Sequence, residues 1–541
     1  MHDGNAAKGP VGPCATPDAG HVEPPKRYSL GTAVCLIMGI CIGSGIFFKS
    51  DNVLMATGGD VGLGVAMFCV AALYIVFGGL ALSLFAARTD GAGGLVDYAQ
   101  RFVSPGFARV LGWFYTFVYL PSVTAVVFWV VGVYACLVAG VDAGFWTQLG
   151  IGVVALLACG ALNALAPRAS GWLQGLTTAL KAVPLVAVGA IGLAALLGGT
   201  AQMAPVAAAQ GAAARGGSLA WLAAAAPIAF SFDGWTAASS IAPELADARR
   251  NLPRALVIAP LAILGLYLAY FVGLSWTLGP DAVMASGDAS LSALFARLLG
   301  PQAAMLPNLV ALLAIVGTGN GLVLALMRMP QAVAMRGDMP GAAWLAEEGD
   351  GHAVPPHSAL VAMATILCWM GVHAAVQTLG LIPNGDVSEV SVSLSMLVMV
   401  PLFAAALRMW RRGEAGVVRG LVAPVLATLG CVFVGVSGVA SAERLPFVLG
   451  ELALVALLWL LWRFECRDAA TAADGGSRRW RCSSTPTRAR SRPTRSQSRG
   501  APGCPWWSPG TRRRTSSATC GRATRARARR PAGASGSRRW P

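Results

Sequence analysis

Twelve long apolar runs constrain this chain more than any other feature of its sequence. A helix needs about 20 apolar residues to cross the roughly 30 Å hydrocarbon core of a bilayer. Of the 541 residues, 55% are hydrophobic and only 12% are charged, which is typical of a membrane protein. The sequence therefore predicts an all-α integral membrane protein with about twelve transmembrane helices. The expected spans lie near residues 30–50, 61–87, 110–139, 146–165, 172–198, 219–246, 255–278, 303–327, 358–380, 387–407, 418–441 and 446–463.

Lysine and arginine lie mostly on one side of these spans. If the N-terminus is cytoplasmic, the outer connections hold only Lys49, Arg215, Arg297 and Arg444, and the inner connections hold many more. Positive residues favour the cytoplasmic side, so this bias predicts that both termini are cytoplasmic. Residues 1–27 have no apolar core ahead of a cleavage site, which indicates an N-terminal tail and not a signal peptide.

The C-terminal segment differs in composition from the rest of the chain. The formal net charge is +16, but 18 arginines and no acidic residue follow Asp474, so the preceding part is nearly neutral. We expect a membrane domain over 28–465 and a disordered tail over 466–541, because such a composition cannot bury a core. The tail is either an Arg-rich segment for nucleic acid or anionic lipid, or an out-of-frame translation of GC-rich DNA. We favour the second interpretation and expect no nucleic-acid partner.

The first span contains a candidate break. The segment GICIGSGIFFKS, Gly39–Ser50, holds Gly43, Ser44 and Gly45 at its centre, and glycine holds a helix poorly. A break in lipid leaves backbone groups unsatisfied, so it is tolerated only where it faces protein or water. The N–H groups that begin the second half-helix would then suit a carboxylate. The alternative is close helix packing, since Gly39 and Gly43 form a GxxxG pair.

The sixth span contains a second candidate break. It carries Gly234 at mid-depth beside a single carboxylate, Asp233, with Pro227 before it and Pro243 after it. The first and sixth spans hold corresponding places in two blocks of five, the pattern expected for the inverted repeats of secondary transporters. The expected repeats are 30–198 and 219–407, and two extra helices follow within 418–463.

Six short motifs, in the right order along residues 28–465, carry a family resemblance. Together they resemble the amino acid/polyamine/organocation (APC) transporters, and DGW resembles the branch of serine/threonine exchangers and L-type light subunits of heteromeric amino acid transporters. The motifs are IGSGIF (42–47), GW with PS (112–113 and 121–122), LQGLTTALKAVPL (173–185), FSFDGW (230–235), RNLPRA (250–255) and AMRGDMP (334–340).

The resemblance implies a leucine-transporter-type fold of two inverted five-helix repeats plus two C-terminal helices, with helices 1 and 6 broken. In that family, N–H groups at the first break hold the substrate carboxylate, and carbonyl groups at the second hold its ammonium group. Phe230 also matches the aromatic gate of the family. The substrate-binding residues implied here are Ile42, Gly43, Ser44, Gly45, Ile46, Phe230, Ser231, Phe232, Asp233 and Gly234.

The chain departs from the family pattern at two inner turns. After the sixth helix, Glu244 is followed by Leu-Ala-Asp-Ala, where the family commonly has Glu-x-Lys-Asn-Pro. The exit of the second span, SLFAARTDGAGG, lacks the usual Tyr-Ala-Glu. These changes affect the inner-gate contacts and the branch assignment. We interpret Glu244 as a gating or surface carboxylate, and Asp233 either as a helix cap or as a proton-coupling group.

A single lysine, Lys181, lies inside an apolar span, and an ionisable group at that depth is costly unless it faces the bundle or water. Gln174, Thr177, Thr178 and Lys181 share one helical stripe, which suggests an inward face. The alternative is a lysine that extends to the boundary. In the family a lysine here replaces a coupling sodium ion. The Lys181 ammonium would either keep its charge permanently or lose its proton during transport, since burial disfavours the charged amine. Thr318 and Asn320 are expected to line the eighth span near that ion position.

The sequence contains no convincing motif of an enzyme. GTGNG at 317–321 imitates a phosphate loop, but it lies in an apolar run with no strand before it. We therefore expect no enzyme, no cofactor and no metal, and predict an amino acid permease or exchanger of the bacterial inner membrane that works by alternating access, with exchange or proton coupling. The alternatives are an amine or polyamine carrier, and a membrane sensor that binds an amino acid without moving it.

Overall fold

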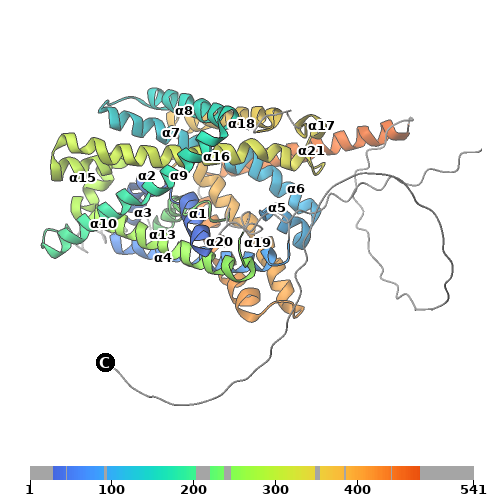
Figure 1. Ribbon diagram of the computed structural model, residues 1–541, viewed down its shortest axis with the longest axis horizontal. Helices are drawn as coiled ribbons and strands as arrows, with labels where there is room; N and C mark the ends of the chain where they lie inside the picture. The colour runs from blue at the N-terminus through green and yellow to red at the C-terminus, as the bar shows by residue number, and fades with distance from the viewer. Residues whose placement is uncertain are drawn as a thin grey trace, which may run out of the picture. The chain divides into compact units, whose positions relative to one another are not determined.

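The computed structural model describes residues 29–43, 45–89, 94–202, 220–236, 245–347, 354–382, 385–439 and 442–474. These residues form helices joined by short turns, and the long helices run side by side (Figure 1). The helices of the N-terminal part are α1 (Leu30–Cys41), α2 (Gly45–Phe48), α3 (Ser50–Thr57), α4 (Val61–Ala86), α5 (Gly94–Tyr98), η1 (Ala99–Val103), α6 (Pro105–Phe114), η2 (Tyr115–Tyr119), α7 (Leu120–Ala139), α8 (Phe145–Leu165), α9 (Pro167–Leu180) and α10 (Ala182–Leu197).

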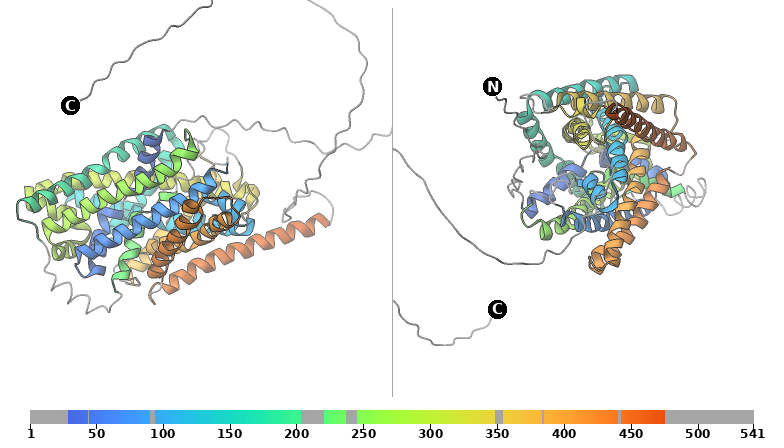
Figure 2. Two further views of the ribbon diagram at one scale, coloured as in Figure 1. Left: turned by 90° about the horizontal axis from the view of Figure 1, so that it is seen from below. Right: turned by 90° about the vertical axis from the view of Figure 1, so that its right-hand side faces the viewer.

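The C-terminal part is helical as well. Its last helix, α21, continues past the boundary expected at residue 465, and its final turns extend beyond the neighbouring helices (Figure 2). The helices are η3 (Ala220–Ala224), α12 (Ala225–Ser231), α13 (Ala248–Leu278), α14 (Pro280–Ser286), η6 (Gly287–Ala289), α15 (Ser290–Leu299), η7 (Pro301–Ala304), α16 (Met305–Ala334), α17 (Ala342–Leu345), α18 (Pro356–Thr378), α19 (Val387–Arg411), η8 (Val418–Val422), α20 (Ala423–Val439) and α21 (Leu445–Asp474).

Polar caps and glycines set the ends of several helices. The side chains of Ser29, Asp60 and Asp386 accept backbone N–H bonds at the starts of α1, α4 and α19. Gly58 and Gly140 end α3 and α7 in the left-handed conformation, with φ of 66° at each. The apolar runs predicted from the sequence therefore have defined ends.

Twelve segments of the described chain are long and apolar enough to span a membrane, as predicted, but they are not the same twelve. The sixth expected span contains a short apolar helix, Trp221–Ser231, and most of its second half lies outside the described residues. Another candidate, Pro280–Leu299, was expected to be an outer connection; it consists of the short helices α14, η6 and α15. Together these reach the length of a span although none does so alone.

Helix packing brings distant parts of the chain together around α1 and α12. α1 packs on α13, α12 packs on α19 and α20, and α16 packs on α7 and α9. Small residues permit close approach: a Cβ atom on Gly192 of α10 would lie 2.2 Å from the Cα atom of Gly273 in α13. The residues on both sides of the first break, Cys41 and Gly45, are buried in the bundle, whereas Gly31 and Cys35 of α1 are exposed.

Candidate functional site

The predicted break in the first span is present. α1 ends at Cys41, where the Ile42 amide closes the last turn on the Met38 carbonyl at 2.8 Å, and the helix resumes at Gly45. The Lys49 amide still donates to the Gly45 carbonyl at 2.9 Å, so α2 and α3 form one bent half-helix. Ser44 lies outside the described residues.

In the sixth span, the helix ends where the break was predicted. α12 ends at Ser231, and the Phe232 and Asp233 amides donate to the Ile228 and Phe230 carbonyls, each at 3.1 Å. Gly234 follows with φ of 92°, a conformation that favours glycine. Residues 237–244 lie outside the described chain, so the gating role of Glu244 and the capping role of Asp233 stay predictions.

The two breaks contact each other directly. A Cβ atom on Gly45 would lie 2.5 Å from the Cα atom of Ser231, and one on Gly234 would lie 2.8 Å from Cγ2 of Ile40. Both contacts need the absence of a side chain. The Tyr267 hydroxyl of α13 lies 2.7 Å from the Ser231 carbonyl oxygen and 3.1 Å from that of Cys41, so one buried phenol joins the two helix ends.

Aromatic rings lie beside the contact between the breaks. Phe230 of α12 packs edge-on against Phe48 of α2, with ring centroids 5.6 Å apart at 83°. The Lys49 ammonium lies 4.8 Å from the Phe48 centroid and 5.5 Å from the Phe230 centroid. The residue expected to form the aromatic gate is therefore 6% exposed and lies under a cation.

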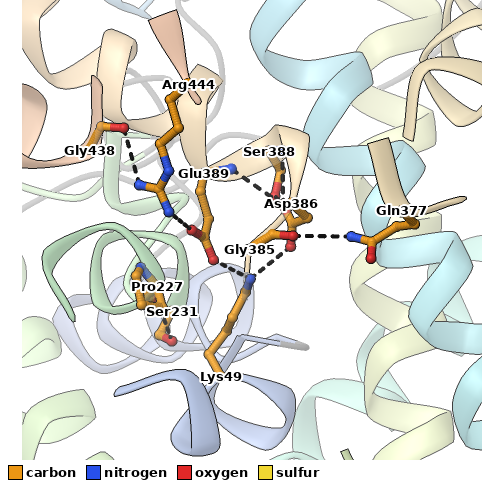
Figure 3. A network of polar contacts seen from close by, with 10 residues as sticks. All are labelled: Lys49, Pro227, Ser231, Gln377, Gly385, Asp386, Ser388, Glu389, Gly438 and Arg444. Atoms are coloured by element: carbon orange, nitrogen blue, oxygen red, sulfur yellow. Dashed lines mark hydrogen bonds and ion pairs between the residues drawn. The ribbon is translucent and has the colours of Figure 1, made fainter. Parts of the chain in front are cut away.

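A buried group of four charged residues continues from that cation; we call Lys49, Asp386, Glu389 and Arg444 the Lys49 network (Figure 3). The Lys49 ammonium donates to Asp386 Oδ2 at 2.7 Å and also to Glu389 Oε1. The other Glu389 oxygen accepts from Arg444 at 2.8 Å. These side chains are between 1% and 10% exposed, and their formal charges cancel.

The electrostatics of the Lys49 network favour the charged forms. Burial alone opposes the charge of Lys49, but Asp386 and Glu389 outweigh it and hold the pKa of the ammonium above its ordinary value. Burial alone would raise the pKa of Asp386, but Lys49 outweighs it and the pKa lies below its ordinary value. The Lys49–Asp386 pair therefore stays ionised at neutral pH.

Lys181 reaches the first break from the opposite side. It is 1% exposed and donates from Nζ to the Gly39 carbonyl oxygen of α1 at 2.6 Å. The inward orientation of its stripe is also seen at Thr177, which is buried against Gly317 of α16. The side chain of Thr178 lies outside the described set. Lys181 is therefore buried in the bundle and does not extend to its boundary.

The two α16 residues expected at the ion position differ in their surroundings. Thr318 faces the break: a Cβ atom on Gly43 would lie 3.0 Å from Thr318 Cγ2. Asn320 instead bonds Asn163 of α8 and Ser170 of α9, each at 2.9 Å. Thr318 belongs to the break region, and Asn320 belongs to a hydrogen-bonded cluster that joins three helices.

Asp233 has a partner outside its own helix. Its Oδ1 atom accepts a hydrogen bond from the Tyr119 hydroxyl of η2. This contact links the second break to the third span. A role for Tyr119 was not predictable from the sequence, because an aromatic residue in an apolar run is usually part of the core.

A second set of ion pairs lies far from the breaks; we call Asp97, Arg109, Arg336 and Asp338 the Arg109 network. Arg109 Nε donates to Asp338 Oδ1 at 2.7 Å, and Arg336 pairs with Asp97 at 2.5 Å. The Arg109 guanidinium also lies 3.7 Å from the ring centroid of Trp462. Arg444 and Trp462 are about 27 Å apart along α21 at 1.5 Å per residue, so the two networks lie toward opposite ends of that helix.

Sequence reasoning missed the Lys49 network and Tyr267. The sequence analysis counted Lys49 and Arg444 among the charges of the outer connections, to predict the orientation of the chain in the membrane. Such a count does not show which charges form ion pairs. The detectable signal was Asp386 and Glu389, two carboxylates three residues apart at the start of the tenth expected span, opposite two cations on the same expected side.

Two interrupted helices that meet inside a bundle of membrane spans define the class of secondary transporters. The chain belongs to the amino acid permease family, whose model matches residues 28–453. This is a family of transporters and not of enzymes.

Individual relatives have low sequence identity to this chain, and their names are those of amino acid exchangers or transporters. The serine/threonine exchanger SteT of Bacillus subtilis is 25% identical over 400 residues, which are 72% of this chain and 84% of the exchanger. The human cystine/glutamate transporter is 25% identical over 344 residues, 60% of this chain and 66% of that protein. The mouse b(0,+)-type amino acid transporter 1 is 26% identical over 327 residues, 58% of this chain and 64% of that protein.

Proposed function

We propose that this protein is a secondary active transporter that moves zwitterionic amino acids across the bacterial inner membrane by alternating access. The observation that supports it best is the direct contact between the two breaks at Gly45 and Ser231. Family membership supports amino acids as the substrate class.

The substrate would bind where the two breaks meet. N–H groups of the Gly43–Gly45 segment would hold the carboxylate, because they begin the half-helix formed by α2 and α3. Carbonyl groups at the end of α12, around Phe230 and Ser231, would hold the ammonium group. Phe230 would cover the bound amino acid. The two helix ends then present opposite partial charges to a zwitterion.

Alternating access requires the two ends of the bundle to open in turn. The Lys49 network would be the outer closure, because it lies over Phe48 and Phe230 and joins α2 to α19. The Arg109 network would be the inner closure, which agrees with the arginine bias of the inner connections and with cytoplasmic termini. We assign the two inverted repeats to residues 30–198 and 219–407 because the first and sixth spans, which carry the breaks, hold corresponding places in two blocks of five.

The mode of coupling is either exchange or proton symport. Exchange is supported by the relative that is named as a serine/threonine exchanger. A proton route is supported by two ionisable groups at the breaks, Lys181, which is buried, and Asp233, which is partly exposed. An amine or polyamine carrier would need a further carboxylate there to receive a second ammonium group, and Asp233 is the carboxylate that the described residues place at the breaks.

The direct test is counterflow in proteoliposomes, preceded by a thermal-shift screen of the natural amino acids. A substrate that binds only the folded protein raises its apparent unfolding temperature. A transporter accumulates labelled amino acid against an internal pool, whereas a membrane sensor would show the shift without accumulation.

The site itself is tested by Gly45→Val, with Gly31→Ala as the matched control on the same span. Any side chain at Gly45 meets the Ser231 backbone, whereas a Cβ atom on Gly31 would meet only Ser29 Oγ at 3.9 Å. We expect Gly45→Val to insert normally and to lose both the thermal shift and counterflow, and Gly31→Ala to keep both. Normal uptake by Gly45→Val would contradict a backbone carboxylate site.

A further inference from the structure

A carboxyl group inside the last span has no role in the site described so far. Glu451 lies in α21, within the apolar run 446–463, and its side chain is buried at 2% exposure. A charged carboxylate at this position in a span is costly unless a cation pairs with it. Glu451 therefore needs either a partner or a proton.

The contacts of Glu451 favour a proton. Its Oε1 atom accepts a hydrogen bond from the Ser391 hydroxyl of α19 at 2.6 Å, and its Oε2 atom is buried with no hydrogen-bond partner among the described residues. Ser391 is neutral, so the pair has no cation to balance an ionised acid. A neutral acid leaves an unpaired polar group in the apolar surroundings, which costs far less than the unpaired charge of a carboxylate.

The charged groups on the neighbouring elements are either engaged or distant from Glu451. α21 packs on α19 and α6. On α19, Asp386 and Glu389 bond Lys49 and Arg444, and Arg408 and Arg411 lie in the last turn, at the other end of the helix. On α6, Arg109 pairs with Asp338 far from Glu451. On α21 itself, Arg463 and Glu465 lie more than three turns further along.

One of those engaged cations is placed to reach Glu451. Arg444 immediately precedes α21 and lies seven residues before Glu451, so the two residues lie about two turns apart on one face of the helix. Both contact α19: Arg444 donates to Glu389 at 2.8 Å, and Glu451 accepts from Ser391. The guanidinium can therefore leave Glu389 for Glu451 without leaving the interface between the two helices.

We propose that Glu451 is a proton-binding site that controls the Lys49 network. With the network closed, Glu389 holds Arg444 and Glu451 keeps its proton. When the network opens, Arg444 leaves Glu389 and pairs with the Glu451 carboxylate, which releases its proton to the outer solution. Closing reverses both steps and takes up one proton, so acid favours the closed state. Lys49 and Asp386 stay charged near neutral pH. Asp51, Asp288 and His373 also lie near the network but form no ion pair with it among the described residues, so we assign the exchange of Arg444 between partners to the titration of Glu451.

This inference rests on the proposed transport function, and the first test is counterflow of labelled L-serine at a series of external pH values. We expect the rate of the wild-type protein to vary with pH by up to about tenfold per unit, the limit for one titrating proton. Glu451→Gln should remove the part of this dependence that Glu451 contributes and leave the part that Lys181 and Asp233 contribute. The exposed neighbour of Arg444 gives the control, Glu443→Gln, which should behave like the wild type. An unchanged pH profile in Glu451→Gln, or a flat profile in the wild type, would overturn the proposal.

Two further measurements keep the test decisive. Ser391→Ala removes the donor that stabilises the ionised acid, so it should move the midpoint of the pH profile upward; an unmoved midpoint would count against the site.

If L-serine is not exchanged at all, the proposed function fails, and thermal unfolding in detergent still tests Glu451. The unfolding temperature of the wild type should then fall as pH rises, because only the folded state keeps the proton, and Glu451→Gln should flatten this slope. Equal slopes would refute the inference.

Discussion

The two ionic networks of this protein both pair basic with acidic side chains, but they differ in burial. In the Lys49 network the side chains are 1% to 10% exposed. In the Arg109 network they are 15% to 24% exposed. Water and salt screen an exposed pair, which contributes about 0–1 kcal/mol. Removal of one partner from a buried pair leaves an uncompensated charge and costs about 3–5 kcal/mol.

This difference indicates which end of the molecule is harder to open. The Lys49 network must separate four buried charges, and Phe48 and Phe230 lie directly beneath it. The pairs of the Arg109 network can be hydrated one at a time. We therefore expect the proposed outer end to be the tighter closure, and the proposed inner end to open at a lower cost.

The largest effect is expected from Lys49→Met. It leaves Asp386 and Glu389 with Arg444 as their single cation, so the free energy of unfolding should fall by about 3–5 kcal/mol. Thermal and denaturant unfolding of the protein in detergent would measure the loss. Because the pKa of Asp386 lies below its ordinary value, the contribution of its pair with Lys49 should persist at neutral pH and be lost only as pH falls below about 3.9.

A double variant tests the cause of that loss. Lys49→Met combined with Asp386→Asn leaves the Glu389–Arg444 pair with balanced charge, so it should recover part of the stability. If the single and double variants were equally unstable, lost packing of the lysine stem would explain the effect better than charge imbalance, and the contrast between the two networks would weaken.

An intermediate effect is expected from Lys181→Ala, on the other side of the first break. Lys49 binds carboxylates, whereas Lys181 binds one neutral carbonyl group, at Gly39. Loss of the amine removes a charged hydrogen bond but also removes the cost of burying it, so stability should change less than turnover. We expect counterflow to slow by about tenfold, which corresponds to about 1.4 kcal/mol in the barrier. Lys181→Met preserves the stem and should show the same defect. Unchanged transport and pH dependence would make Lys181 a structural residue.

The sequence predicted the helical class, most of the spans and both breaks, because each depends on local composition. Apolar runs have the length of a span, and Gly43, Gly45 and Gly234 interrupt two of them. A side chain at Gly45 or Gly234 would meet the other interrupted span, and one at Gly43 would meet Thr318 of α16. The inward orientation of Lys181 was also predictable from the cost of a lysine in lipid.

The parts that were not predictable depend on pairing between distant residues. Lys49 and Glu389 are 340 positions apart, and Tyr267 joins two carbonyl groups from different helices. A single sequence shows that such residues exist but not which face each presents. Asn320 illustrates the same limit, since its position in the eighth span suited an ion site but its amide bonds Asn163 and Ser170.

The smallest effect is expected from Arg109→Gln, which removes one partly exposed pair with Asp338 and the stacking on Trp462. The free energy of unfolding should fall by no more than about 1 kcal/mol. A change of that size still shifts the ratio of open to closed states by about fivefold, so Arg109→Gln should favour the inward-open state while unfolding almost like the wild type. Arg109→Lys, which keeps the charge but loses the planar contact, separates the two contributions. If Arg109→Gln lost as much stability as Lys49→Met, the Arg109 network would be as costly to break as the more deeply buried Lys49 network. Burial would then not explain a difference between the two ends.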